Sequence, residues 1–348
     1  MTQFHSSVNP NSATFAQNRE DMLSAISTLE DIVQRAAVLS DKSLPRFERR
    51  GQLLPRDRLS RVLDSGMPFL ELMNMAGFLV DDDNRETSVA GCSTIVGIGY
   101  VGGARCMVMV DDSGINAGAM TALSTKKANR AMDIAREKKL PFIHLVESAG
   151  ANLLEYQVEM WMDGGGVFAR LARLSAAGVP TFVVLHGASA AGGAYMPGMS
   201  DYVIGVKGNG KAYLAGPALL KAATGEEADD EELGGAQMHS RVTGLVEYLA
   251  EDDAHGIAIC RELVERLDWN RLCQQPPPRE YAEPLYDIDE LAGIVPADYR
   301  QPYDVREVAA RIVDSSDILD FKPAYGAATV CMQARVFGMP VGIIGNNG

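Results

Sequence analysis

The sequence has 348 residues, a mass of 37.4 kDa and 47% hydrophobic residues, and its formal net charge at pH 7 is −14. A chain of this length can bury a sizeable core and is expected to hold more than one domain. The negative charge argues against nucleic acid or an anionic membrane as the main partner, because both repel an acidic protein. No apolar run approaches the length of a membrane span, and the first residues lack the basic-then-apolar order of a signal peptide, so a soluble, cytoplasmic protein is expected.

The five cysteines show no spacing typical of a metal site or a disulfide framework. None forms a Cys-x-x-Cys pair, and none is paired in spacing with a histidine. We therefore expect buried thiols in a reducing compartment and no metal in this chain. The cysteines are Cys92, Cys106, Cys260, Cys273 and Cys331.

The first part of the chain predicts two helices, a hairpin and a third helix. Apolar residues at helical spacing indicate an amphipathic helix from Ala16 to Leu39, and Pro55 is well placed to begin a short helix through Leu63. The pattern from Cys92 to Asp111, around Gly102-Gly103, predicts a β-hairpin. A helix is expected from Ser124, as a candidate cap, to Lys138.

Lys126 and Lys127 fall in the first turn of that third helix, where the helix dipole disfavours positive charge. Most lysines in such places are simply solvated. A phosphate contact is the alternative interpretation.

Two apolar strands are each followed by a turn of small residues. Strand 142–146 leads to the loop 147–152, and strand 181–185 leads to the stretch from Gly187 to Asp201. A glycine-rich stretch at 164–166 lacks the Gly-Lys-Ser/Thr ending of a phosphate-binding loop. The repeated order of strand, glycine turn and helix therefore indicates a spiral of ββα units rather than a nucleotide-binding fold.

The second of these turns is the candidate functional site. Its small side chains let the backbone N–H groups of Ala191, Gly192 and Gly193 approach a ligand. The start of a helix also favours developing negative charge, so this is the geometry of an oxyanion hole. Close packing of a helix on a strand is the alternative role for such glycines.

The last part of the chain contains a linker and an internal repeat. The proline-rich stretch at 274–284 is the clearest linker, and the pattern of 329–347 resembles that of 95–112 at a constant offset. A second copy of the first domain that stops at Gly348 would be cut one strand pair in, so we expect the chain to be a fragment. The predicted divisions are an N-terminal extension with its helix at 1–40, a domain at 41–273, the linker at 274–284, and the start of a second, truncated domain at 285–348.

Six strings of residues carry a resemblance to a known family. The spacing of Gly187, Gly192, Gly193 and Asp201 resembles the crotonase superfamily. Together the strings resemble the carboxyltransferase (β) subunit of biotin-dependent acyl-CoA carboxylases of the propionyl-, methylcrotonyl- and geranyl-CoA type. The resemblance implies an α/β, crotonase-like (ClpP/crotonase) fold. The strings are Gly51–Arg58, Ser148–Asn152, Ala190–Tyr195, Leu214–Pro217, Leu233–Ala236 and Tyr303–Val308.

The resemblance implies a reaction in which a carboxyl group passes from carboxybiotin to an acyl-CoA through a thioester enolate. It assigns the thioester carbonyl to the turn at Ala191 and Gly192, with Gly193 adjacent. It places the CoA moiety beside the first loop, which comprises Ser148, Ala149, Gly150, Ala151 and Asn152. A site built on main-chain amides explains a motif with almost no ionisable side chains.

The resemblance also implies partners. Biotin is expected on another chain, because Asn74 stands where a biotin-attachment tripeptide carries its lysine. The expected partner is a biotin carboxylase and carrier (α) subunit, and the family forms homo-oligomers that are hexamers. The stretch at 161–168 and the sequence after Asn152 depart from the methylcrotonyl-, geranyl- and propionyl-type patterns, so the acyl-CoA stays open.

Other functions are alternatives to this one. A ClpP-like protease has its nucleophilic serine where this chain has Ala191, and Ser189 is out of register. An enoyl-CoA hydratase uses paired carboxylates, one of which would fall at Tyr195. The carboxyltransferase of a sodium-pumping acyl-CoA decarboxylase and a non-catalytic acyl-CoA-binding scaffold remain alternatives. Of the five histidines, only His239 suggests a role that mutation should test.

Overall fold

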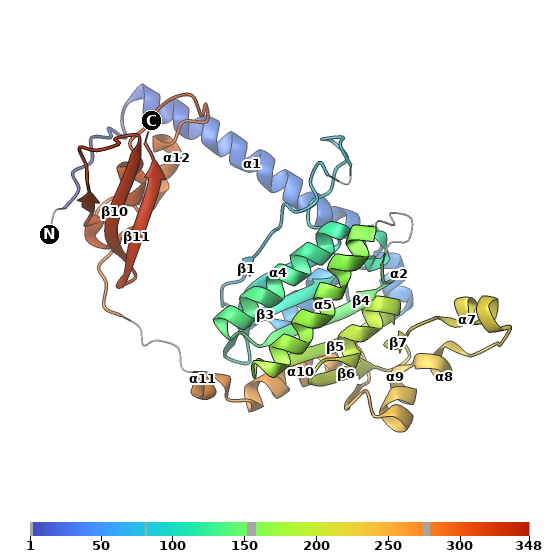
Figure 1. Cartoon of the computed structure of the whole chain (residues 1–348). Coiled ribbons are helices and arrows are strands. Elements are labelled where there is room, and N and C mark those ends of the chain that lie inside the picture. Colours follow the sequence, from blue (N-terminus) through green and yellow to red (C-terminus); the bar gives the residue numbers. More distant parts are fainter. Residues whose placement is uncertain (1–2, 81, 152–157, 274–278, 348) are drawn as a thin grey trace. The chain divides into compact units, whose positions relative to one another are not determined.

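A computed structural model describes residues 3–80, 82–151, 158–273 and 279–347. Contacts within the chain divide it into a larger unit, Ile32–Gln274, and a smaller unit made of Met1–Asp31 and Gln275–Gly348 (Figure 1). The domain boundaries given above stay a prediction.

The larger unit is built on one mixed sheet. Its strands are β1 (Leu70–Glu71), β2 (Thr94–Val101), β3 (Ala104–Asp111), β4 (Phe142–Ser148), β5 (Thr181–Ala190), β6 (Tyr202–Val206), β7 (Lys211–Tyr213) and β8 (Tyr248–Ala250). Their order in the sheet is β1-β2-β3-β4-β5-β6-β8, and β7 pairs with β5. β1, β2 and β3 are antiparallel, whereas β3, β4, β5, β6 and β8 are parallel.

The helices include several short ones around the strand ends. They are α1 (Ala13–Asp41), α2 (Leu44–Arg49), α3 (Pro55–Val62), α4 (Ala122–Lys138), α5 (Val158–Ala176), α6 (Tyr195–Gly198), α7 (Pro217–Thr224), α8 (Asp230–Gly234), α9 (Ala236–Met238), α10 (Asp253–Arg266), α11 (Trp269–Leu272), α12 (Leu291–Ile294) and α13 (Val305–Ala309). The single-turn segments are η1 (Asn116–Gly118), η3 (Ala191–Ala194), η4 (His239–Thr243), η5 (Ile288–Glu290) and η6 (Asp314–Ser316).

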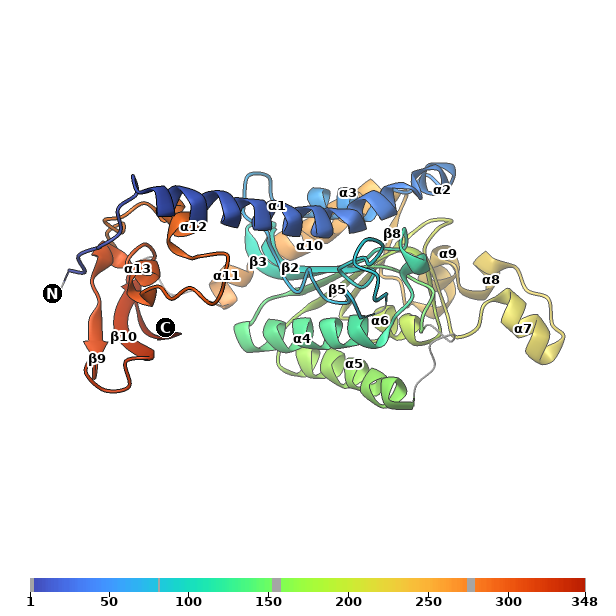
Figure 2. The ribbon, with the colours of Figure 1, turned by 90° about the horizontal axis from the view of Figure 1, so that it is seen from above.

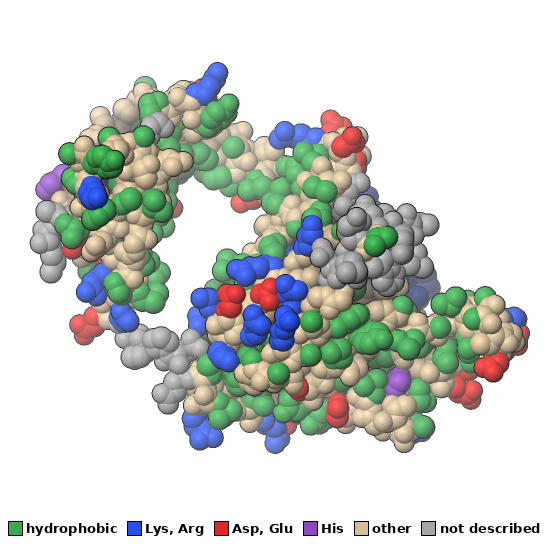
Figure 3. Space-filling view, viewed as in Figure 1, with side chains coloured by type: hydrophobic (Ala, Val, Ile, Leu, Met, Phe, Trp, Pro, Cys, Tyr) green, Lys and Arg blue, Asp and Glu red, His purple; other side chains and the backbone are tan. Residues whose placement is uncertain are grey.

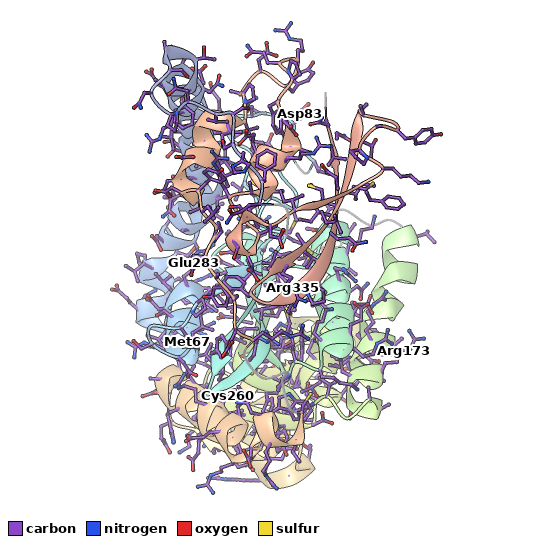
Figure 4. The ribbon with its side chains drawn as sticks, turned by 90° about the vertical axis from the view of Figure 1, so that its left-hand side faces the viewer. Met67, Asp83, Arg173, Cys260, Glu283 and Arg335 are labelled. Carbon is purple, nitrogen blue, oxygen red and sulfur yellow. The ribbon has the colours of Figure 1, made fainter. Side chains whose placement is uncertain are left out.

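Helices cover both faces of the sheet in the larger unit. Figure 2 shows α3 and α10 on one face and α4 and α5 on the other. In Figure 4, Cys260 marks α10 and Arg173 marks α5 on opposite sides of the strands. All seven residues of β4 are buried, as expected for a parallel strand with two covered faces. Each face therefore has its own apolar core, one under α4 and α5 and one under α3 and α10.

The start of the third predicted helix differs from the observed one. α4 begins at Ala122 rather than Ser124, because Thr121 is the cap and its hydroxyl accepts the Ser124 amide. The Ser124 hydroxyl in turn accepts the Thr121 amide at 2.7 Å, which completes a capping box. In the smaller unit, α13 has Asp304 as its cap.

The smaller unit packs the N-terminal residues against the C-terminal ones. The Glu307 carboxylate accepts hydrogen bonds from the Ser6 hydroxyl at 2.6 Å and the Ser7 amide at 2.8 Å. Arg311, which is buried, lies between Glu307 and Glu290. The Phe15 ring packs on Gly293, where a Cβ would lie 2.4 Å from the ring. The first residues are thus tied into this unit.

Each unit contains a hairpin where the sequence repeat was predicted, while the second copy of the domain stays a prediction. In the smaller unit, β10 (Thr329–Val336) pairs with β11 (Met339–Asn346) and with β9 (Leu319–Phe321). The first and last residues of β10 and β11 follow those of β2 and β3 at one constant offset in residue number. Asp64 accepts the amides of Gly102 and Gly103 at one hairpin turn, and Asp314 accepts those of Phe337 and Gly338 at the other.

Lys127 is buried, so the phosphate contact considered for it is wrong. Its ammonium donates to the carbonyl oxygens of Gly91, at 3.2 Å, and Thr94, at 2.5 Å. These bonds tie α4 to the start of β2. Burial, opposed mainly by the charge of Glu71, lowers the pKa of Lys127 from 10.5 to about 8.

The Lys127 pKa predicts a pH dependence of stability. Between about pH 8 and pH 10.5 the unfolded chain holds a proton on this amine that the folded chain has lost, so folding becomes more favourable as the pH rises through that window. We expect the free energy of unfolding of the full-length protein, minus that of Lys127→Met, to rise by up to about 1.4 kcal/mol per pH unit there. Denaturant titrations from pH 7 to pH 10.5 measure this difference. A pH-independent difference would contradict the prediction.

Candidate functional site

The two small-residue turns follow neighbouring parallel strands. β4 and β5 pair along their length, and after an irregularity between Val146 and Ser148 the register resumes with Ser148 opposite Ser189. Since both strands end at the same edge of the sheet, the loop that begins at Ala149 and the turn η3 lie side by side. The Ala149 amide donates to the Ala117 carbonyl at 3.1 Å, and the Gly150 carbonyl accepts the Met120 amide at 2.8 Å.

The backbone of these turns has an unusual conformation. Ala191 has φ +52° and Gly150 has φ +83°. A Cβ at Gly150 would lie 2.8 Å from the Ala190 carbonyl oxygen, so only glycine allows the two turns to approach this closely. A left-handed alanine is uncommon and mildly strained, and such residues cluster at functional sites.

A cavity of about 350 Å³ opens where the turns meet. Among the described residues that line it, none is ionisable. In Figure 3 the surface between α5 and α7 is mainly hydrophobic, whereas charged side chains cover the outer face of α4 and α5. The lining residues are Met120, Thr125, Ala149, Ala151, Gly165, Val167, Phe168, Ala190, Ala191, Gly192, Met196, Leu214, Ala215, Gly216 and Leu219.

The structure brings together most of the predicted site residues, and their roles stay predictions. Four line the cavity: Ala149, Ala151, Ala191 and Gly192. Gly150 lies between the first two. Ser148, at the end of β4, and Gly193, within η3, are buried. Asn152 falls outside the described residues.

Sequence reasoning missed the apolar wall of the cavity. Phe168 on α5 stacks on Tyr195 with ring centroids 4.5 Å apart and faces Gly192. Leu214 and Leu219 come from the segment before α7 and from α7 itself. One signal was available, since the string Leu214–Pro217 carried part of the family resemblance without a role. No pattern in the sequence pointed to Phe168 or Met196.

A buried ionic cluster lies behind the first loop. Arg58 of α3 is fully buried and contacts two carboxylates, Glu147 Oε2 at 2.7 Å and Asp253 Oδ2 at 2.8 Å. The Asp253 carboxylate also accepts the Leu53 amide at 2.9 Å, and the Gln52 amide side chain donates to the His186 carbonyl at 2.8 Å. The string from Gly51 to Arg58 therefore joins β4, β5 and α10.

His186 and Asp253 form the other end of this cluster. His186 Nδ1 lies 2.9 Å from Asp253 Oδ1. Burial, and then the Arg58 charge, lower the pKa of His186 below its ordinary range. Burial alone would raise the pKa of Asp253, but the His186 contact and the Arg58 charge outweigh it and lower that pKa below 3.8. Asp253 is thus held as a carboxylate that contacts Arg58 and His186.

His239 has a structural explanation. Its Nε2 lies 2.8 Å from the Ala212 carbonyl oxygen, and its Nδ1 lies 2.9 Å from the Thr243 hydroxyl. The ring therefore ties η4 to β7. No group of three or more His, Cys, Asp or Glu side chains that could hold a metal is found in the described parts of the chain. Within those same ranges, none of the helices has the length and apolarity that a membrane crossing requires.

The absence of a side chain at Gly187 makes room for Glu147. A Cβ on Gly187 would lie 2.4 Å from Glu147 Cγ and 2.5 Å from its Cδ. We expect Gly187→Ala to push this carboxylate away from Arg58 and to lower the free energy of unfolding of the full-length protein by about 3 kcal/mol, the cost of breaking a buried ion pair. Urea denaturation measures the change.

Gly198→Ala is the matched control, because a Cβ there meets nothing within 4 Å. It should leave the free energy of unfolding unchanged or slightly raised, since alanine favours helix over glycine. Equal stability of the two variants would show that Gly187 is not needed to seat Glu147.

The carboxyl transferase domain family matches residues 47–348. A protein of Mycobacterium tuberculosis named "Probable biotin-dependent acyl-coenzyme A carboxylase beta2 subunit" is 43% identical over 98% of this chain and 63% of its own length. The mitochondrial methylcrotonoyl-CoA carboxylase beta chain of Dictyostelium discoideum is 41% identical over 98% of this chain and 58% of its own length. The chain thus spans about three fifths of these relatives.

A solved structure shows the same fold. The beta subunit of geranyl-CoA carboxylase from P. aeruginosa superposes with a TM-score of 0.91 at 47% sequence identity, and the match covers 100% of this chain and 64% of that one. The α/β, crotonase-like fold predicted from the sequence is confirmed.

Proposed function

Because the chain belongs to the carboxyl transferase domain family, we propose that it is the carboxyltransferase component of a biotin-dependent acyl-CoA carboxylase. It transfers a carboxyl group from carboxybiotin to an acyl-CoA. One observation supports this most: the cavity adjoins a turn of small residues and has no ionisable group among its described lining residues.

The difficulty in this chemistry is to make the enolate of the thioester. The turn at Ala191 and Gly192 lines the cavity, and we assign its backbone N–H groups to the enolate oxygen. Such donors are worth a few kcal/mol each in a site that excludes water. The lining supplies no base, so the residues fit a reaction in which the base is brought in with the second substrate. Carboxybiotin, carried on another chain, supplies the carboxyl group and that base.

The CoA part of the substrate is assigned to the first loop. Ala149 and Ala151 line the cavity beside the turn, and their small side chains leave room for a pantetheine arm. The acyl part is assigned to the wall formed by Val167, Phe168 and Met196. An entirely apolar wall favours a branched, unsaturated acyl group over acetyl, because each buried methylene contributes about 0.8 kcal/mol. This agrees with relatives named for methylcrotonoyl-CoA and geranyl-CoA.

The partners follow from the same assignment. We propose that a biotin carboxylase and carrier subunit delivers the biotin and that the chain acts within a homo-oligomer, a hexamer as in the family. A cytoplasmic location stays a prediction. A decarboxylase coupled to sodium export uses a similar subunit, and a non-catalytic scaffold would bind acyl-CoA without turnover.

A panel of acyl-CoA substrates tests the proposed function. The full-length protein is mixed with its biotin carboxylase and carrier subunit and supplied with acetyl-, propionyl-, methylcrotonyl- and geranyl-CoA. We expect kcat/KM for one of the two branched, unsaturated substrates to exceed that for acetyl-CoA by about tenfold or more, because more apolar surface is buried. No carboxylation of any substrate would contradict the proposed function.

Substitution of Gly192 tests the turn itself. A Cβ there would point toward the Phe168 ring, 3.8 Å from its Cζ, and the methyl groups of valine would crowd the cavity. Gly192→Val is expected to lower kcat by a factor of about 100 or more, the cost of losing an oxyanion donor, with an unchanged circular dichroism spectrum.

Gly342→Val in β11 is the control, because a Cβ there meets nothing within 4 Å and valine suits a strand. It should retain full activity. A Gly192→Val protein as active as this control would rule out the assigned role.

A further inference from the structure

A second, small cavity lies beneath the turn. It has a volume of about 10 Å³ and is distinct from the larger cavity above the turn. Its lining includes Ser148 and Ser189 at the ends of β4 and β5, and Gly193 of the turn. Asp111 and His144 line it from β3 and β4. A group of polar residues thus faces a small space in a layer that is otherwise mainly apolar.

Three of these polar side chains are buried; Asp111 accepts the Glu147 amide at 3.3 Å, whereas the other two lack a partner. Ser189 is 0% exposed, His144 is 2% exposed and Asp111 is 5% exposed. Among the described residues, the Ser189 hydroxyl and both ring nitrogens of His144 have no hydrogen-bonding partner. His144 Nε2 lies 3.1 Å from Asp111 Oδ2, but not in the alignment that a hydrogen bond requires. Buried polar groups are normally satisfied, so this cluster lacks a partner.

A serine, a histidine and an aspartate around one cavity are also the members of a hydrolase triad. That function does not fit here. The cavity is too small for any acyl group, and Ser189 does not line the larger cavity where a thioester would bind. The cluster therefore acts from below the site and does not contact the substrate.

We propose that the small cavity is a binding site for one water molecule and that Ser189 and His144 are positioning residues that hold the turn through this water. The volume is about that of one water, and the surrounding hydroxyl, imidazole and carboxylate groups supply the two to four partners that a buried water needs. A water bonded to Ser189, near the end of β5, and to His144, within β4, joins the two strands from which the catalytic loops begin. The effect on turnover rests on the proposed function. The water site itself does not depend on that function.

The water site is tested by a crystal structure of the full-length protein at a resolution that shows ordered water. Density for one water within hydrogen-bonding distance of Ser189 Oγ and a His144 nitrogen supports the proposal. A dry cavity, or a direct hydrogen bond from Ser189 to His144 that closes it, overturns the proposal. This test needs no activity, so it stands even if no acyl-CoA is carboxylated.

The positioning role is tested by kinetics in the assembled carboxylase. Ser189→Ala removes one partner of the water, and kcat is expected to fall about fivefold with KM unchanged, as for the loss of one hydrogen bond. His144→Leu should behave likewise, whereas His144→Gln, which keeps a polar group, should recover much of the loss.

Ser60→Ala, at an exposed serine of α3, is the control and should match the wild type. Wild-type kcat in both Ser189→Ala and His144→Leu would overturn the positioning role. A change confined to KM, with kcat unaltered, would also overturn the positioning role.

Discussion

The contact of Arg58 with Glu147 and Asp253 is the constraint on which the site depends. It joins α3, β4 and α10 at a point that is closed to solvent. A buried guanidinium needs carboxylate partners, because a charge left alone in the interior is very costly. Glu147 is also the residue before Ser148, where the first loop begins. The ion pair therefore fixes the start of a loop that has no charged side chain of its own among its described residues, and Gly187 leaves the space in which it forms.

The site above this cluster has no ionisable side chain among its described lining residues. Its described lining is mainly apolar, and the groups assigned to the reaction are main-chain amides that need no particular side chain. The chain instead positions these amides, because two parallel strands, β4 and β5, end together and place two turns side by side. Buried charge and buried polar groups lie on the inner side of these turns, while the cavity side is left free for an acyl group. This separation is consistent with a reaction whose proton acceptor arrives with another molecule.

Local patterns in the sequence were enough to predict β2, β3, β4 and β5, the two turns and the hairpin repeat. Ala191 and Gly192 were found because small residues follow an apolar run, which is a property of neighbouring residues. The start of α4 was missed by two residues because Thr121, and not only Ser124, offers a capping hydroxyl. Contacts between distant residues could not be predicted in this way. Arg58 and Asp253 are far apart in the chain, and Ser189 and His144 are brought together only when β5 pairs with β4. The apolar wall from Phe168 and Leu219 likewise depends on how α5 and α7 pack.

The left-handed alanine at the turn has a consequence for the entropy of the site. Ala191 adopts φ +52°, where glycine would be free of strain. Alanine costs about 1 kcal/mol in this conformation, but it has fewer conformations to lose when the chain folds than glycine has. The turn is thus stiffer than a glycine turn of the same shape. Stiffness at this position holds the amides in their orientation before a substrate binds. The backbone therefore needs little reorganisation when negative charge forms on the substrate.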